Sequence, residues 1–230
     1  MRIYTIEHFD RLLKSLGSEL MHANVIYDLF LGLNQSFTDY QNEVNQSTVF
    51  WGITRDAIRE KATLALCRIY DEDHRTNSLP NLLNEIRDNP ELGKDVTNDE
   101  GIVKVLDRVQ LEQDIEFAGN TNPSLNRLIR WRSLMFAHLN AKKVATNRPL
   151  RKEEVPLYSD FETLLKEGLT IINRYAGHFH SAEYSTIFPA GDDFRFVLDS
   201  VRENLNLHRK QYAAELRRYG LDPKKHGLEE

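Results

Sequence analysis

The fold is decided by the stretch Leu12–Leu33, LLKSLGSELMHANVIYDLFLGL, in which apolar residues recur every three or four positions. This spacing is typical of an amphipathic helix, because residues three and four apart lie on the same face. Gly17 makes a break possible, so the pattern predicts a short helix and then a long one that ends near Tyr40. A second long helix is expected from Ser47, a candidate N-cap, to about Tyr70.

Helical spacing continues through the rest of the chain, and no strand-like alternation is long enough to compete with it. Further helices are expected at 78–88, 102–111, 124–147, 159–174 and 193–219. The sequence therefore predicts an all-α protein, a helical bundle with two long N-terminal helices and additional C-terminal helices. We expect a single domain over residues 1–220 and a polar, flexible tail at 221–230.

Composition and charge exclude several classes of protein. Apolar residues make up 40 % of the chain and charged residues 28 %, as in an ordinary globular protein. No stretch approaches the roughly 20 apolar residues of a membrane span, and the first residues lack the features of an export signal. The single Cys67 excludes an intrachain disulfide and a cysteine-based zinc cluster, and its apolar neighbours favour a core residue. We therefore expect a cytoplasmic protein without membrane contact.

A basic island runs from Phe117 to Lys152. These 36 residues contain eight Lys and Arg but no Asp or Glu, whereas the whole chain has a net charge of −5. A local positive field on an acidic protein favours an anion-binding site, with RNA phosphate as the obvious ligand. A basic helix packed against acidic neighbours explains the charges equally well.

The helix expected within this island has two apolar faces. One holds Leu125, Leu128, Ile129, Phe136 and Leu139 around Arg132, and the adjacent one holds Trp131, Leu134, Met135, Ala141 and Ala145 around His138. A helix that is apolar over so much of its circumference is expected to be buried on two sides. The simplest second surface is another copy of the chain, so a two-fold homodimer is predicted.

Arg132 and His138 are the candidate functional side chains of this helix. A guanidinium on an apolar stripe needs a carboxylate or a bound phosphate, and its own helix offers no carboxylate. An unperturbed histidine has a pKa of about 6.5 and is suited to proton transfer near neutral pH. Six residues place the two side chains on different faces, so two copies of the helix would be needed to build one cleft.

Arg132-Ser133-x4-His138 resembles the Arg-(polar)-x-His signature of HEPN domains, which are all-helical RNA-cleaving or nucleotide-associated modules. The continuation FAHLNAK at 136–142 resembles the abortive-infection, AbiU-like branch, where Ala-His-x-(Asp/Asn)-x-Lys is common. Upstream, LCRIYD at 66–71 and SLPNLL at 78–83 resemble the end of a long helix and its following turn in that branch. The similarity covers about 20–144. Ser133 departs from the Asn or Asp that many members carry.

The resemblance implies a HEPN-like bundle and a metal-independent endoribonuclease, acting as a toxin or anti-phage effector. Arg132 and His138 would be catalytic, with Ser133, Asn140, Lys142, Arg130 and Lys143 supporting them or binding RNA. His138 of one subunit would act as general base and its dimer mate as acid while the 2′-hydroxyl attacks the phosphate, and Arg132 would stabilise the phosphorane. The implied partners are RNA, a second copy and an antitoxin protein, with no cofactor or metal.

Other interpretations of these residues remain open. His138 would then be a structural histidine at an interface, and Arg132 would pair with Asp71 or Asp73 across the bundle. The whole chain would then be a non-catalytic helical module that binds nucleic acid, nucleotide or a protein.

Two further clusters offer weaker signals for a metal site. His178 and His180 are two residues apart, so they would point apart on a helix, and we expect them in a loop. The run Asp71–His74 is expected to be a solvated helix end.

Overall fold

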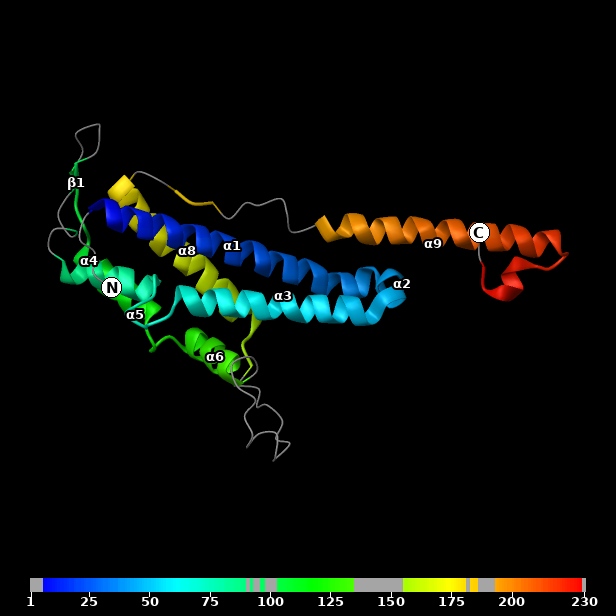
Figure 1. Ribbon diagram of the computed structural model, residues 1–230, viewed down its shortest axis with the longest axis horizontal. Coiled ribbons are helices and arrows are strands. Elements are labelled where there is room, and N and C mark those ends of the chain that lie inside the picture. Colours follow the sequence, from blue (N-terminus) through cyan, green and yellow to red (C-terminus); the bar gives the residue numbers. More distant parts are fainter. Residues whose placement is uncertain are drawn as a thin grey trace, which may run out of the picture. The chain divides into compact units, whose positions relative to one another are not determined.

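Helices dominate the part of the chain that the structure describes. The computed structural model describes residues 6–89, 92, 96–97, 103–134, 155–180, 183–185 and 193–228. Its α-helices are α1 (Ile6–Asp39), α2 (Gln41–Val44), α3 (Thr48–Ile69), α4 (Leu79–Asp88), α5 (Arg108–Ala118), α6 (Pro123–Arg132), α8 (Tyr158–His180) and α9 (Asp193–Arg218) (Figure 1). The same ranges hold two 3-10 helices, η1 (Asn45–Ser47) and η5 (Pro223–His226), and two short strands, β1 (Val96–Thr97) and β2 (Val103–Lys104).

The predicted all-α fold is confirmed. The two strands pair antiparallel over two residues each and form the whole of the sheet seen in the described ranges. In the same ranges no helix combines the length and the apolar character that crossing a membrane requires.

The chain divides into two compact units, each built from two separate segments. Unit 1 comprises Met1–Tyr27 and Ile58–Ile187, and unit 2 comprises Asp28–Ala57 and Phe188–Glu230. Helices α1 and α3 each contribute one part to either unit. The single domain expected over residues 1–220 stays a prediction.

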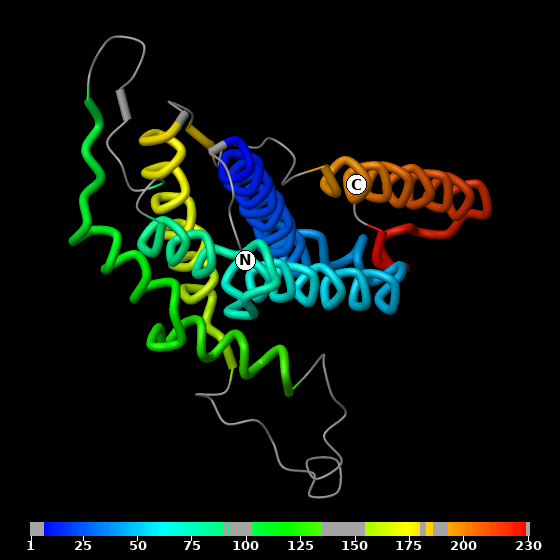
Figure 2. Tube along the Cα trace, turned by 60° about the vertical axis from the view of Figure 1, so that its left-hand side comes forward, coloured from blue at the N-terminus to red at the C-terminus, as the bar shows by residue number. Residues whose placement is uncertain are grey.

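In unit 1, α8 runs antiparallel to the first part of α1 (Figures 1 and 2). The rings of Tyr27 and Phe161 stack with their centroids 5.2 Å apart, and those of Phe9 and Phe179 meet edge to face at 4.7 Å. This pairing is antiparallel because the start of α1 meets the end of α8. The aromatic contacts, with the leucines of α1, form a core that holds α8 in place.

The end of α3 crosses the middle of α8 at a glycine. Tyr70, just after α3, is fully buried and donates a hydrogen bond from its hydroxyl to the carbonyl of Leu164 at 2.6 Å. A Cβ at Gly168 would lie 2.6 Å from that hydroxyl oxygen. The crossing therefore requires a residue without a side chain at this point of α8.

Unit 2 is held together by contacts between α2 and α9. Arg202 of α9 donates to the buried carboxylate of Glu43 at 2.9 Å and lies 4.2 Å from the ring centroid of Tyr40. Tyr40 in turn donates to Asp199 at 2.9 Å. Within the tail predicted at 221–230, η5 forms a turn that is capped by the Asp222 carboxylate.

Several predicted boundaries need correction. The helix expected at 102–111 is wrong in its first half, because Val103 and Lys104 lie in β2 and α5 starts only at Arg108, after the Asp107 cap. The break considered at Gly17 does not occur, since α1 is continuous from Ile6 to Asp39.

Candidate functional site

The N-terminal end of α6 is fixed by its cap. The Asn122 side-chain oxygen accepts hydrogen bonds from the backbone N–H groups of Ser124 and Leu125, at 3.0 and 3.4 Å. Its amide nitrogen donates to the Phe117 carbonyl at 2.9 Å. Pro123 occupies the first helical position, where its missing N–H costs nothing. The sequence Asn-Pro-Ser therefore starts the basic helix at a defined residue.

A buried carboxylate on α8 holds the first turns of α6. Asp160, with a side chain only 2 % exposed, forms an ion pair with Arg127 and accepts from Ser124 Oγ at 2.7 Å. Its other oxygen accepts from the backbone N–H of Leu157 at 2.7 Å. Burial acts to raise the pKa of Asp160, but the hydrogen bonds from Arg127, Ser124 and Leu157 outweigh it, and the pKa is lowered.

A second anchor joins the turn after α3 to the loop before α6. Glu72 accepts from both the backbone N–H and the side-chain amide of Asn120, and Asn126 of α6 donates to the Asn120 carbonyl at 2.5 Å. The loop therefore connects α6 to the turn at Asp71–Thr76 and limits where the helix can lie.

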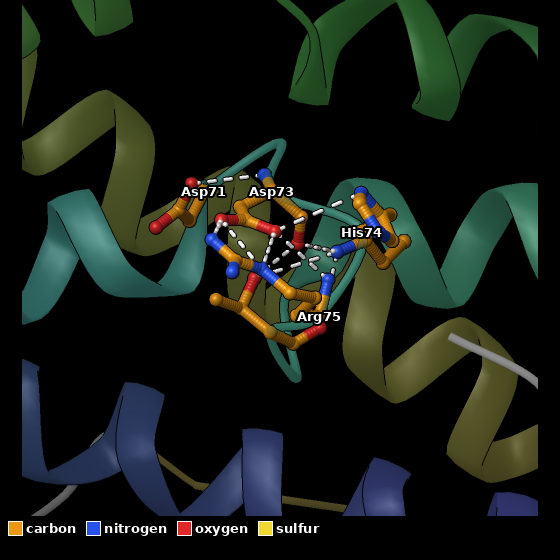
Figure 3. Close-up of polar contacts among 6 residues, drawn as sticks. Asp71, Asp73, His74 and Arg75 are labelled. Carbon is orange, nitrogen blue, oxygen red and sulfur yellow. Dashed lines mark hydrogen bonds and ion pairs between the residues drawn. The ribbon is translucent and has the colours of Figure 1, made fainter.

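The turn after α3 is ordered by its own side chains (Figure 3). The Asp73 carboxylate accepts from the Arg75 guanidinium at 2.5 to 3.2 Å, and Asp71 Oδ1 accepts from the Asp73 backbone N–H at 3.0 Å. His74 Nδ1 lies 3.8 Å from Asp73. The described residues contain no group of three or more His, Cys, Asp or Glu side chains that could hold a metal ion. Asp73 is thus occupied within its own turn.

Arg132 lies at the last residue of α6, beside α3. Its Nε is buried without a hydrogen-bond partner, and none of the described residues forms an ion pair with its guanidinium. The alternative of an ion pair with Asp71 or Asp73 therefore has no support within this part of the chain. Burial raises the pKa of the Cys67 thiol to about 12, although the nearby Arg132 charge acts to lower it. Cys67 is a buried core residue, as predicted.

The neighbours of Arg132 on α6 differ in their surroundings. Trp131 is only 6 % exposed, and the Arg59 guanidinium of α3 lies 5.7 Å from its ring centroid. Arg130 is exposed. Ser133 donates its hydroxyl to the carbonyl of Ile129, one turn earlier, at 3.0 Å. Trp131, which belongs to one of the two predicted apolar faces, is therefore covered within one chain.

The other predicted site residues, His138, Asn140, Lys142 and Lys143, lie outside the described residues. The structure thus brings Arg130, Arg132 and Ser133 to one end of α6.

Sequence reasoning missed Arg59 and Asp160, two of the residues that contact this helix from other elements. No local sequence pattern indicates the role of either residue. Asp160, for example, is 33 residues away in sequence from its partner Arg127. The expectation for His178 was also wrong: it is buried within α8 instead of lying in a loop.

Comparison with known protein families identifies a family to which the chain is similar. A family model, HEPN_AbiU2, described as AbiU2, matches residues 6–206 of the chain. No curated protein and no solved structure matches the chain.

Proposed function

The chain belongs to the AbiU2 family of HEPN domains, and from this premise we propose that it is an abortive-infection effector that cleaves RNA without a metal ion. In the proposed reaction the 2′-hydroxyl of one nucleotide attacks its adjacent phosphate. The products are a cyclic phosphate and a 5′-hydroxyl. His138 takes the proton of the attacking hydroxyl, and the His138 of a second copy gives a proton to the leaving oxygen.

The proposal is supported most by the state of Arg132. A buried nitrogen without a partner costs about 1–3 kcal/mol, and a bound ligand is one way in which such a group is satisfied. A phosphate oxygen would accept from this guanidinium and neutralise its charge. As the phosphorane forms, the same donor would stabilise its extra negative charge. The unpartnered Nε of Arg132 thus supports the proposal that this residue binds a phosphate.

The anchors of α6 give this arginine a fixed position. Asn122, Asp160 and Asn120 together hold the start of the helix against α8 and the turn after α3. Because an α-helix is stiff over ten residues, fixing its start also fixes the turn that carries Arg132. A charge held in this way needs little reorganisation when the transition state forms.

The same proposal assigns supporting roles and partners. Arg130, Ser133, Asn140, Lys142 and Lys143 would bind the RNA strand around the reacting phosphate. The composite site requires a homodimer, and an antitoxin protein would keep the nuclease inactive. Such an effector would act in the cytoplasm.

Ser133 favours a second candidate function, a non-catalytic helical module that binds nucleic acid, nucleotide or a protein. Its hydroxyl is used within its own helix, on the carbonyl of Ile129. It is therefore not available to orient Arg132 in the way that a longer Asn or Asp side chain could be.

A cleavage assay on purified wild-type protein and variants tests the proposal. Arg132→Ala and His138→Ala should each reduce the rate of RNA cleavage by about 10²–10⁴, because each removes a group that the transition state needs. EDTA should leave the wild-type rate unchanged. Arg11→Ala, at an exposed arginine of α1, is the matched control and should cleave normally.

Two outcomes would reject parts of the proposal. Cleavage that survives His138→Ala would exclude the assigned mechanism. Wild-type protein that binds RNA but leaves it intact would favour the non-catalytic module.

A further inference from the structure

The end of α8 that carries His178 borders a cavity of about 350 Å³. Its walls are the segment around β2, with Lys104, Val105 and Leu106, and the last turns of α8, with Arg174, Tyr175 and His178. Pockets that hold small ligands start at about 300 Å³. Arg174 is 14 residues beyond Asp160, roughly 20 Å along the helix, so the cavity lies well away from the contact between α6 and α8.

The position of Arg174 is fixed by a buried carboxylate on α5. Asp114 of α5, 5 % exposed, forms an ion pair with Arg174 Nη1 and accepts from Tyr175 Oη at 2.9 Å and Gln110 Nε2 at 3.0 Å. A guanidinium has five N–H donors, and this ion pair engages one of its terminal nitrogens. The side chain is about one-third exposed where it lines the cavity. Arg174 is thus a cation in a fixed position that keeps N–H donors which the ion pair does not use.

Two more basic side chains share the cavity. Lys104 donates to the Gly177 carbonyl at 2.6 Å, which holds its ammonium group at the end of α8. The His178 side chain is nine-tenths buried in the wall. Among the described residues of the lining the carboxylate is that of Asp107, which caps α5 and accepts from Gln110 N at 3.0 Å. Val105 and Leu106 add apolar surface next to these polar groups.

We propose that this cavity binds a small organic anion, a phosphate monoester or a carboxylate on an apolar body. The anionic group would accept hydrogen bonds from Arg174 and Lys104. Arginine side chains held in place often bind such groups through bidentate hydrogen bonds. The apolar body would lie against Val105 and Leu106. This site goes beyond RNA cleavage and does not depend on it, because none of its residues belongs to the end of α6.

Titration calorimetry on the full chain tests the proposal, with adenosine monophosphate, benzoate and uncharged adenosine as probes. Arg174→Lys keeps a positive charge opposite Asp114 but removes the planar guanidinium that can bind an anion through two N–H groups. Lys104→Gln removes the second cation. Lys166→Gln, at an exposed lysine of the same helix, is the control. Thermal melting of each variant shows whether it folds. If Arg174→Lys does not fold, the binding measured for Lys104→Gln decides the test.

Saturable binding of adenosine monophosphate would identify a phosphate ligand, and binding of benzoate a carboxylate ligand. Folded variants at Arg174 and Lys104 should bind at least about tenfold more weakly, whereas Lys166→Gln should bind as wild type does. The proposal fails if neither anion binds, if adenosine binds as tightly as its monophosphate, or if both folded variants keep wild-type affinity. None of these measurements involves RNA, so the result is independent of nuclease activity.

Discussion

Three arginines of unit 1 differ in how their charge is compensated. Arg127 and Arg174 each pair with a buried aspartate, Asp160 and Asp114. Arg132 has no such partner among the described residues, although it lies only five residues after Arg127 on the same helix. Paired guanidinium groups hold the fold together, whereas an unpaired one in a partly buried position costs stability.

This contrast predicts opposite effects for one substitution at two positions. Arg127→Met should lower the free energy of unfolding by about 3 kcal/mol, because it leaves the Asp160 carboxylate buried with fewer donors. Arg132→Met should raise it by about 1 kcal/mol, because it removes an unsatisfied donor from a partly apolar site. Urea unfolding of both variants measures the difference. A loss of stability at Arg132 equal to that at Arg127 would show that Arg132 has a partner in the folded chain.

The lowered pKa of Asp160 predicts a pH dependence of stability. In the unfolded chain the pKa of an aspartate is about 3.9, and in the folded chain the pKa of Asp160 is lower. Its contribution is therefore fully present above pH 4 and is lost as the pH falls toward the folded pKa. Asp160→Asn should be clearly less stable than wild type at pH 7, and the gap should narrow below pH 4. Urea unfolding over this range, with exposed Asp56→Asn as control, would show it. A gap that does not change with pH would contradict the argument.

At the level of elements, the crossing of α3 over α8 depends on one missing side chain. Gly168→Ala should destabilise the protein by roughly 2 kcal/mol, because the added carbon would displace the Tyr70 hydroxyl from the Leu164 carbonyl. Gly177→Ala, in the same helix, meets no atom within 4 Å. It should stabilise α8 by up to about 1 kcal/mol, since alanine favours helix. Thermal unfolding of the two variants separates the steric effect from the effect of helix propensity. Equal changes in stability would contradict the requirement for glycine at position 168.

Apolar spacing predicted most helices but could not show what covers them. The stripe from Ile102 to Leu111 suggested a helix, yet Val103, Val105 and Val109 are 55–71 % exposed. Their spacing therefore did not reflect burial, and α5 starts at its cap instead. Gly17 lies inside a continuous helix, and the ring of Tyr184 packs so closely over it that a Cβ would not fit. A contact across 167 residues leaves no trace in the local pattern.

The candidate site was predictable to a similar extent. The basic island and the isolated arginine pointed to Arg132, because an uncompensated charge is visible in sequence. Asp160 and Arg59 were not predictable, since their roles arise only when α8 and α3 pack against α6. The charges of a site can be counted along the chain, but the residues that position it depend on tertiary packing.

For the whole molecule, the predicted homodimer can be tested by mass. Light scattering at micromolar concentration should give twice the 26.8 kDa of one chain, because the composite site needs two copies of His138. Trp131 is covered by its own chain, so Trp131→Phe should leave the mass unchanged. A monomer under these conditions would remove the basis for a shared cleft.

Two of the three boundaries between the compact units fall inside helices instead of at linkers. One lies between Tyr27 and Asp28 in the middle of α1, and another between Ala57 and Ile58 in the middle of α3. Protein modules that recombine between genes are usually joined through exposed loops, where a cut disturbs few contacts. A crossover at either boundary here would have to preserve the register of a continuous helix. Evolution is therefore expected to pass the two units on together, and to vary them by substitution instead of by exchange.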